Sequence, residues 1–316
     1  MKSIAICEFG GRDKLQLVDL PVPESGRKEI LVRVKAAGVN PVDWKIREGY
    51  LKDLFPHEFP VILGWDAAGV VAGVGQDVTR FKEGDEIFAY CRKPVVQGGT
   101  YAEYTLVEEE HAALKPKNSS YEEAASIPLA ALTAYQALFD AARLESEETV
   151  LIHAAAGGVG GFGVQLAKDR GAIVWGTASK RNAEYVKELG AARVVDYTRT
   201  DFREAVRSEY PDGVDAVLDC VGGEVLEKSA DVVKKGGRLI SIVDDPTDLG
   251  ANDIVSEFVF VAPNHSQLSK LSEMFEQGRL KTHLSRVLPL GLQEVKKAHE
   301  LSESHRTRGK IVLVIG

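Results

Sequence analysis

The spacing of hydrophobic positions along the chain changes near residue 120. Before that point, short apolar runs alternate with polar residues or glycines, at 30–34, 69–75, 86–90 and 101–106. Gly, Pro and Asp lie between these runs, which is the pattern of short antiparallel strands joined by turns. The N-terminal part of the chain therefore predicts a β-rich domain whose strands form a partly closed barrel.

From Thr149 onward, near-continuous apolar runs alternate with segments of helical spacing. The runs lie at 149–153, 173–175, 193–195, 216–219, 238–242 and 258–261, and helices are expected at 159–170 and 182–189. Strands without polar alternation are buried on both faces, as in a parallel sheet that helices cover. This region predicts an α/β domain with a doubly wound sheet.

The flanking segments complete the pattern. Residues 122–142 have helical spacing that Pro128 interrupts, and an amphipathic helix is expected from Pro263 to Gln277. A polar stretch follows, and an apolar run at 310–314 closes the chain. That run cannot easily extend the doubly wound sheet, so we expect it to return to the first domain.

Composition narrows the possible partners. The 316 residues are enough for two domains. Lys and Arg number 39 and Asp and Glu 47, a net charge of −8, which disfavours nucleic acids as partners. No apolar run is long enough to span a membrane, and the N-terminal residues lack a secretion signal. Three scattered cysteines, Cys7, Cys91 and Cys220, do not suggest a disulfide framework. We therefore expect a cytoplasmic protein.

The strongest local signal is a turn between a predicted strand and a predicted helix, residues 153–160 (His-Ala-Ala-Ala-Gly-Gly-Val-Gly). This is the setting of a dinucleotide fingerprint. Gly157 lets the backbone approach a pyrophosphate, the helix N-terminus offers unpaired N–H groups, and Gly160 permits close packing of helix on strand. Ala155 replaces the first glycine of the usual pattern, and a small-residue turn without a ligand is the alternative.

The end of the next strand predicts which nucleotide is bound. A site for NAD carries Asp or Glu about 20 residues past the glycines, bonded to the ribose 2′-hydroxyl. Residues 176–181 instead contain Ser179, Lys180 and Arg181 and no carboxylate. Hydroxyl and cationic donors suit a 2′-phosphate, so we expect NADPH. A solvated basic turn is the alternative.

Motifs along nearly the whole chain resemble one family. They are residues 36–43 (Ala-Ala-Gly-Val-Asn-Pro-Val-Asp), 64–71 (Gly-Trp-Asp-Ala-Ala-Gly-Val-Val), 98–104 (Gly-Gly-Thr-Tyr-Ala-Glu-Tyr), 132–134 (Leu-Thr-Ala), the glycine-rich turn and 309–312 (Gly-Lys-Ile-Val). The chain resembles the medium-chain dehydrogenase/reductase superfamily, in its zinc-independent quinone oxidoreductase branch. The resemblance implies a GroES-like β-rich substrate domain, residues 1–123 and 265–316, and an inserted Rossmann domain, residues 124–264. It also implies a homodimer joined through edge strands near 258–261.

The resemblance further implies roles for individual residues. Thr133 would contact the nicotinamide carboxamide, and Asn40 would lie beside the nicotinamide at the cleft. Further cofactor contacts are expected at the pyrophosphate (Gly157, Gly158, Val159, Gly160 and Lys310), at the adenosine 2′-phosphate (Ser179, Lys180, Arg181 and Tyr197) and along the ribose and ring (Val221, Ile242 and Val243). Ala156 and Thr177 are also expected to contact the cofactor.

The expected site contains no metal. Zinc-dependent relatives carry Gly-His-Glu where this chain has Gly-Trp-Asp at 64–66, and Trp65 cannot ligate a metal. Cys91 is a single thiol, whereas a tetrahedral site needs four ligands. The dipeptide 57–58 (His-Glu) precedes the motif and is interpreted as an exposed loop. Cys7 and Cys220 are expected to be small core residues.

Without a Lewis acid, a conjugated acceptor is the easiest substrate to reduce, because charge spreads to an enolate or hydroquinone oxygen. Candidate catalytic donors to that oxygen are Asn40, Lys45 and Tyr50, on the loop that the resemblance places at the cleft. Asn40 shaping a turn, Lys45 in solvent and Tyr50 in packing are the alternatives. Some relatives carry Tyr at the place of Lys45. Asp43 is expected to orient the loop, and His153 to be structural.

Three hypotheses for the function follow. The leading one is an NADPH-dependent, metal-free oxidoreductase that transfers hydride to quinones or α,β-unsaturated carbonyls. The second is a zinc-free alcohol dehydrogenase. The third is an NADPH-binding sensor or partner protein without turnover, because an intact glycine-rich turn suits an enzyme and a sensor equally.

Overall fold

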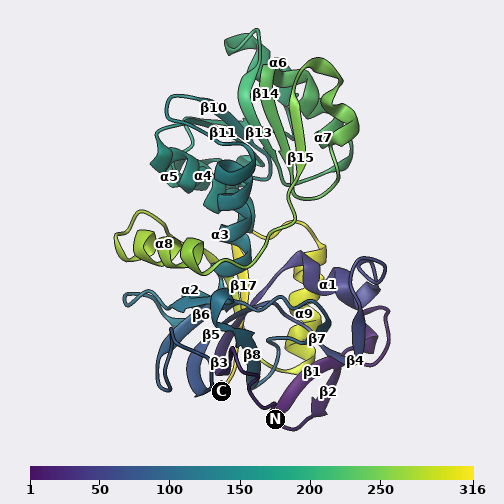
Figure 1. Ribbon diagram of the computed structural model, residues 1–316. Coiled ribbons are helices and arrows are strands. Elements are labelled where there is room, and N and C mark those ends of the chain that lie inside the picture. Colours follow the sequence, from purple (N-terminus) through teal and green to yellow (C-terminus); the bar gives the residue numbers. More distant parts are fainter. The chain divides into compact units, whose positions relative to one another are not determined.

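The computed structural model divides the chain into two units (Figure 1). It describes the backbone of residues 1–316 and the side chains of all residues outside 250–252. The first unit contains Met1–Leu129 and Pro263–Gly316, and the second contains Ala130–Ala262. The second unit is thus inserted between the two parts of the first, with boundaries close to those expected at 123/124 and 264/265.

Two sheets form the framework of the first unit. Its strands are β1 (Lys2–Ile6), β2 (Gln16–Asp19), β3 (Glu29–Val39), β4 (His57–Ile62), β5 (Asp66–Val74), β6 (Glu86–Tyr90), β7 (Val96–Gly98), β8 (Tyr104–Glu108), β9 (Ala112–Leu114), β16 (Leu284–Pro289) and β17 (Lys310–Val314). One sheet has the order β2-β1-β4-β7, and the other has the order β16-β17-β3-β5-β6-β9, with β8 also paired to β3. Strand β17 pairs with β3 and β16, so the final apolar run returns to the first unit as predicted.

Short helices connect these strands. They are α1 (Pro41–Glu48), α2 (Tyr121–Ala125), α8 (His265–Glu276) and α9 (Leu292–Glu303), with 3-10 turns at Arg12–Lys14 and Glu109–His111. Helix α8 is the expected amphipathic helix. Helix α9 lies in the polar stretch, where the sequence pattern predicted no helix. Its buried residues are Val295, Ala298 and His299, so two aliphatic side chains alone mark its inner face in the sequence.

The second unit is a parallel sheet of six strands, β10 (Thr149–Ile152), β11 (Ile173–Ala178), β12 (Arg193–Asp196), β13 (Val214–Asp219), β14 (Val233–Ser241) and β15 (Val255–Phe258). Their order is β12-β11-β10-β13-β14-β15, and every pairing is parallel. Numbered within the sheet, this is the order 3-2-1-4-5-6 of dinucleotide-binding folds. The predicted Rossmann topology is therefore confirmed.

The helices of the second unit connect successive strands. They are α4 (Gly158–Arg170), α5 (Ala183–Leu189), α6 (Phe202–Glu209) and α7 (Gly223–Ser229), with 3-10 turns at Lys180–Asn182, Ala230–Val232 and Thr247–Asn252. The expected helix at 122–142 is divided into α2, α3 (Pro128–Tyr135) and a π-helix (Gln136–Ala141). Among the helices of the described residues, none is long and apolar enough to cross a membrane.

Alternate residues of the central strands bury opposite faces of this sheet. Leu151 and Trp175 belong to one buried cluster together with Phe202 of α6. The adjacent Ile152 faces α4, where a Cβ on Gly163 would lie 3.5 Å from the Ile152 side chain. Burial on both faces explains why these strands lack polar alternation in the sequence.

Candidate functional site

The glycine-rich turn joins β10 to α4, and Gly157 is the N-cap of that helix, with φ −78°. The Ala155 N–H donates to the Thr177 carbonyl at 3.0 Å, and the Gly157 N–H donates to the Ala154 carbonyl at 2.8 Å. The first N–H groups of a helix have no acceptor within the helix. Here they follow a turn that is itself held by hydrogen bonds, which is a suitable arrangement for an anion.

Gly160 has no room for a side chain. A Cβ at this position would lie 2.4 Å from the Ala154 carbonyl oxygen, which is closer than real Cβ contacts. Ala154 itself has a φ of 49°, so the turn lies tightly against the first turn of the helix. Ala156 is buried, and Gly158 and Val159 are half-buried. The turn therefore offers mainly backbone N–H groups to a ligand.

His153 precedes the turn and is a structural histidine, as predicted. It is 1% exposed, with Nδ1 3.1 Å from the Thr177 hydroxyl and Nε2 3.0 Å from the Ser229 hydroxyl. Burial lowers the pKa of His153 to about 3, so the ring is neutral at physiological pH. A neutral ring with both nitrogens engaged fixes the end of β10 from which the turn departs.

The structure corrects the role expected of Thr177. This residue lies inside β11, is 3% exposed, and contacts His153 through its hydroxyl. The same hydroxyl accepts the Ala154 N–H at 3.3 Å. Thr177 thus supports the glycine-rich turn from within the unit, instead of contacting the cofactor directly.

The other expected cofactor residues of the second unit gather at one edge of the sheet. Because all six strands are parallel, their carboxyl ends meet at that edge, where the glycine-rich turn also lies. Ser179 is half-buried there, and Lys180 and Arg181 are exposed. The remaining residues follow β12, β13 and β14 at this edge: Tyr197 (61% exposed), Val221 (46% exposed), Ile242 and Val243. Thr133 is 4% exposed and lies on α3.

Two acidic residues that the sequence did not single out shape this edge. Asp219, at the end of β13, accepts the backbone N–H groups of Val221 and Gly222 at about 3 Å and the Ser241 hydroxyl at 2.8 Å. Burial raises the pKa of Asp219. An Asp at a strand end, three residues before a Gly-Gly pair, was the available signal. The carboxylate fixes the loop that presents Val221.

The second acidic residue is Asp196, at the end of β12 beside β11. Hydrogen bonds from Thr198 lower the pKa of Asp196, and the nearby backbone N–H of Lys180 contributes to that lowering. Residues 176–181 contain no carboxylate, but the neighbouring strand brings one to the same turn. Arg199 lies 3.9 Å from it.

In the first unit, Asn40 lies in a buried polar cluster. Asn40 is 1% exposed and is the N-cap of α1. Its backbone N–H donates to Asp43 at 2.8 Å, and its Nδ2 donates to Asp66 at 2.8 Å. Its Oδ1 accepts from the ammonium of Lys310, and Tyr101 donates to Asp43 at 2.8 Å. We call these five residues the Asn40 cluster.

This geometry corrects the role expected of Lys310. Its Nζ lies 3.7 Å from an Asp66 carboxylate oxygen and donates to the Val39 carbonyl at 3.3 Å, besides its bond to Asn40. The residue is 4% exposed, so its charge is used inside the first unit instead of being directed at a pyrophosphate. Sequence alone places Lys310 at the start of a strand and does not reveal its pairing.

Burial dominates the titration of the Asn40 cluster. It raises the pKa of Asp43 to about 7 and also raises the pKa of Asp66, and it lowers the pKa of Lys310. Asp43 forms a capping box with Asn40, which confirms that Asp43 orients this segment. The segment is the start of a helix, however, and not the loop that was expected.

The other two catalytic candidates lie farther along the same helix and just after it. Lys45 is half-buried, with Nζ 6.0 Å from the Trp44 ring centroid. Tyr50 is 66% exposed, and its ring centroid lies 5.8 Å from that of Trp44 in an edge-on contact. Both side chains are thus arranged around Trp44, and neither hydrogen-bonds within the Asn40 cluster in the part of the chain that the structure describes.

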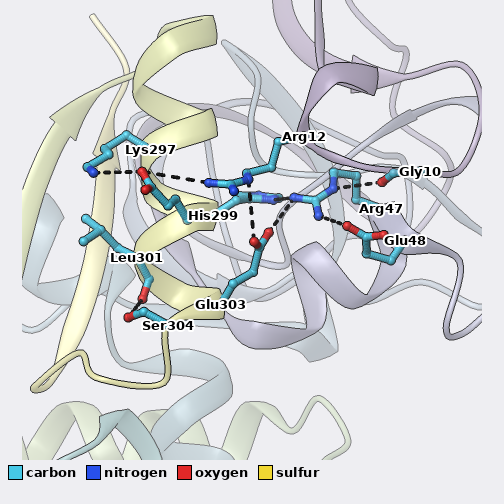
Figure 2. Close-up of polar contacts among 10 residues, drawn as sticks. Gly10, Arg12, Arg47, Glu48, Lys297, His299, Leu301, Glu303 and Ser304 are labelled. Atoms are coloured by element: carbon cyan, nitrogen blue, oxygen red, sulfur yellow. Dashed lines mark hydrogen bonds and ion pairs between the residues drawn. The ribbon is translucent and has the colours of Figure 1, made fainter.

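Arg47 holds the other end of α1 against α9 (Figure 2). It is 1% exposed. Its Nε donates to the Gly10 carbonyl at 3.1 Å, and its Nη1 donates to His299 Nδ1 at 3.0 Å and to Glu303 at 2.9 Å. Glu48 forms a further ion pair with it. Burial lowers the pKa of His299 to about 3, so the neutral ring can accept from the guanidinium.

The residues present do not fit a zinc ion. Trp65 is buried at the place of a ligand in zinc-dependent relatives, and Asp66 already contacts an ammonium group. Burial raises the pKa of the Cys91 thiol to about 12, whereas a ligand must be a thiolate. Within the described residues, no group of three or more His, Cys, Asp or Glu side chains is arranged to hold a metal.

The two remaining cysteines differ from expectation. Cys7 is exposed, so its interpretation as a core residue is wrong. It follows the last residue of β1, where the strand has ended and its side chain is no longer covered. Cys220 is partly exposed, and its position beside Asp219 together with burial of the thiol raises its pKa well above the usual value.

Two family models match the chain. Residues 26–117 match the alcohol dehydrogenase GroES-like domain, and residues 189–313 match a model described as zinc-binding dehydrogenase. The first match lies within the first unit, and the second extends from the second unit into the C-terminal part of the first. Among the residues whose side chains the structure describes, no group of three or more His, Cys, Asp or Glu is arranged to hold the zinc named in the second description.

Named relatives align with almost the whole chain. It is 36% identical to 2-methylene-furan-3-one reductase of Solanum lycopersicum, over 99% of this chain and 79% of the relative. It is 35% identical to the chloroplastic NADPH-dependent alkenal/one oxidoreductase of Arabidopsis thaliana, over the same shares. The structure of the quinone oxidoreductase from Coxiella burnetii superimposes with a TM-score of 0.91 at 35% identity, covering 100% of this chain and 99% of that one.

The buried histidine below the turn predicts a pH dependence of stability. Unfolded His153 binds a proton below its ordinary pKa of 6.5, whereas the folded ring stays neutral down to a pKa of about 3. Stability from this neutral ring is therefore complete above pH 6.5 and is lost as pH falls toward 3. We expect His153→Gln to flatten the fall in the free energy of unfolding between pH 7 and pH 5, measured by urea denaturation. The exposed His305→Gln should leave the slope unchanged, and an unchanged slope in His153→Gln would contradict the assignment.

Proposed function

The chain belongs to the medium-chain dehydrogenase/reductase superfamily, in its quinone oxidoreductase branch, and we propose that it reduces quinones or α,β-unsaturated carbonyls with NADPH. The names of two relatives support this class of reaction, since one is an NADPH-dependent alkenal/one oxidoreductase and the other a reductase of 2-methylene-furan-3-one. The observation that carries the proposal is the glycine-rich turn, where Gly160 lets the turn pack closely on the start of α4, whose N-terminal backbone N–H groups suit a diphosphate.

The residues of the second unit suit a dinucleotide with a 2′-phosphate. The backbone of 156–160 would hold the diphosphate, and the bound cofactor supplies the hydride. Lys180 and Arg181 bring two cations to the turn after β11, against the single carboxylate of Asp196. The local charge thus favours a phosphate over a hydroxyl. Further contacts are proposed for Thr133, Ser179, Tyr197, Val221, Ile242 and Val243.

The proposal includes no metal, because Asp66 is engaged by Asn40 and by the Lys310 ammonium. A zinc ion there would have to displace a buried cation of the protein. Without a Lewis acid, an isolated carbonyl is hard to reduce, since its oxygen would gain charge that nothing delocalises. A quinone or enone spreads that charge over its conjugated system, so hydrogen-bond donors suffice.

We propose Asn40, Lys45 and Tyr50 as the residues of the first unit that contact the substrate. Asn40 can donate through its amide, Lys45 carries an ammonium, and Tyr50 combines an exposed ring with a hydroxyl. Trp44 packs against both Lys45 and Tyr50 and limits their movement. Asn40 remains a proposed neighbour of the cofactor through the family alone.

A second copy of the chain is the proposed protein partner. Strand β15 is the last strand in the order of its sheet, which leaves one side of it available for pairing. Val255 is 54% exposed and Phe258 37% exposed, and Phe260 just beyond the strand is 39% exposed. An edge strand with apolar side chains suits pairing with an identical strand, which would join two sheets and cover these side chains.

We propose a reducing compartment for the protein. Cys7, Cys91 and Cys220 are all free thiols, and an oxidising compartment would favour disulfides. The cytoplasm meets this condition. A relative at 35% identity is chloroplastic by name, so a reducing organelle is the alternative. The localisation of a tagged chain distinguishes the cytoplasm from such an organelle.

Turnover is the first test of the function. We expect the purified chain to oxidise NADPH with benzoquinone, phenanthrenequinone and hexenal, because each acceptor is conjugated. Hexanal, which lacks the double bond, is the matched control and should give no reaction, and a zinc chelator should not change the rates. Turnover that requires zinc, or reduction of hexanal alone, would contradict the proposal. Tight NADPH binding without turnover on any acceptor would favour a sensor.

The cofactor preference is tested by thermal stability. A ligand at about 100 times its Kd stabilises the fold by about 2.7 kcal/mol. We expect NADPH to raise the melting temperature clearly more than NADH, and the double variant Lys180→Ala/Arg181→Ala to narrow that difference. Gly160→Ala should weaken the response to both nucleotides. The control is Lys235→Ala, 84% exposed at the other end of β14. Equal shifts with the two nucleotides in the unaltered chain would refute the 2′-phosphate site.

Oligomeric state tests the β15 interface. We expect the chain of 34.3 kDa to sediment as a dimer and Phe258→Asp to sediment as a monomer, because a carboxylate would be buried without a partner. Val74→Asp, at a half-exposed valine of the first unit, is the control and should stay dimeric. A monomeric parent chain, or a dimeric Phe258→Asp variant, would overturn this interface.

A further inference from the structure

The side-chain amide of Asn40 lies between two opposite charges. Its Nδ2 donates to Asp66 at 2.8 Å, and its Oδ1 accepts from the Lys310 ammonium. Asp66 is 0% exposed and Lys310 4% exposed, so water does not compete for these contacts. In such surroundings, polar interactions are stronger than at the surface.

This arrangement permits one orientation of the amide. A carboxylate can only accept hydrogen bonds, and an ammonium can only donate them. If the amide of Asn40 were turned over, its oxygen would face the Asp66 carboxylate and its N–H groups would face Lys310. Both contacts would then be repulsive inside the protein. The two charges therefore determine that the amide nitrogen faces Asp66 and the amide oxygen faces Lys310.

The backbone of Asn40 is fixed independently. Its N–H donates to Asp43 at 2.8 Å, and Asp43 is itself held by the hydroxyl of Tyr101 at 2.8 Å. Asp66 also accepts the Leu129 N–H at 2.8 Å, in the first turn of α3. The residue can thus neither swing away nor rotate its amide without breaking several buried contacts.

Once its orientation is fixed, the amide has one N–H group left for a further hydrogen bond. One N–H of Nδ2 is used by Asp66, and the second N–H is left as a donor whose direction follows from the first. An N–H donor suits an oxygen that gains negative charge during reduction, whereas an amide oxygen in its place would repel that charge.

We propose that Asp66 and Lys310 are positioning residues that orient the Asn40 amide so that it presents an N–H group to the oxygen of a carbonyl substrate. The proposal rests on the proposed function, because it assigns the donor for that reaction. A merely structural ion pair makes a different prediction. If Asp66 and Lys310 are positioning residues, a variant that regains stability without the two charges should not regain catalytic activity.

Paired variants separate the two roles. We expect Asp66→Asn and Lys310→Met each to lower the melting temperature, because each leaves one buried charge without its partner. The double variant Asp66→Asn/Lys310→Met removes both charges and should regain much of that stability. Its kcat with benzoquinone should nevertheless stay about tenfold to a hundredfold below that of the parent chain, up to the lower end of the range for complete loss of one oxyanion donor, which is about a hundredfold to a thousandfold.

A matched ion pair elsewhere serves as the control. Arg238 and Glu148 are paired at 2.9 Å in the second unit, away from the Asn40 cluster in sequence and partly buried. The double variant Glu148→Gln/Arg238→Met should show a similar change in melting temperature without the loss of kcat. If the Asp66→Asn/Lys310→Met variant regains kcat together with stability, Asp66 and Lys310 are only structural and the proposal is overturned.

A second measurement does not depend on turnover. The chain has five asparagines, at 40, 118, 182, 252 and 264, so selective ¹⁵N labelling of asparagine yields few side-chain amide signals. We expect the Asn40 pair, assigned by its loss in Asn40→Ala, to be shifted downfield and to exchange with water far more slowly than the exposed Asn118. Both properties should disappear in the Asp66→Asn/Lys310→Met variant.

The two measurements separate failure of the inference from failure of the function. If the chain reduces no acceptor but the Asn40 amide exchanges slowly with water as expected, the proposed function is wrong and the fixed orientation of the amide is supported. Rapid exchange at Asn40 in the parent chain, or protection that persists in the double variant, overturns the fixed amide whether or not the chain turns over.

Discussion

A charge can be buried in a protein only where an opposite charge or several hydrogen bonds meet it, and the first unit is arranged around this constraint. Asp66, Lys310 and Arg47 are almost inaccessible to solvent and belong to β5, β17 and α1. Helix α1 buries one aliphatic side chain, Ile46, together with Asp43 and Arg47. Its position therefore depends on polar pairing at both ends, with Asn40 at its start and Arg47 near its end.

The second unit fixes its candidate site with few charged side chains. Its glycine-rich turn is held by backbone hydrogen bonds, by the neutral ring of His153 and by the hydroxyl of Thr177. The direction of the parallel strands then brings the remaining residues to the same edge without any specific pairing. One unit thus fixes a single amide by charge, and the other fixes a row of backbone N–H groups by topology.

The parts of this structure that the sequence predicts are those with a local signal. Gly160 and the apolar strands around it reveal the Rossmann topology, because close packing and burial on both faces act directly on the residues concerned. Helix α9 was missed, since His299 takes a buried place that an aliphatic residue usually fills. Lys310 has a role that depends on strands far away in sequence, and Asp196 reaches the turn after β11 only through the pairing of β12 with β11, so no local pattern contains this information.

The insertion of one unit into the other has a consequence for biosynthesis. Strand β17 lies between β16 and β3, so the larger sheet of the first unit lacks a central strand until residues 310–314 have left the ribosome. Until then, Asp66 has no ammonium partner, whereas every strand of the second unit has already been made. The inserted unit can therefore fold while the N-terminal sheet still lacks this strand and the Lys310 counter-ion of Asp66.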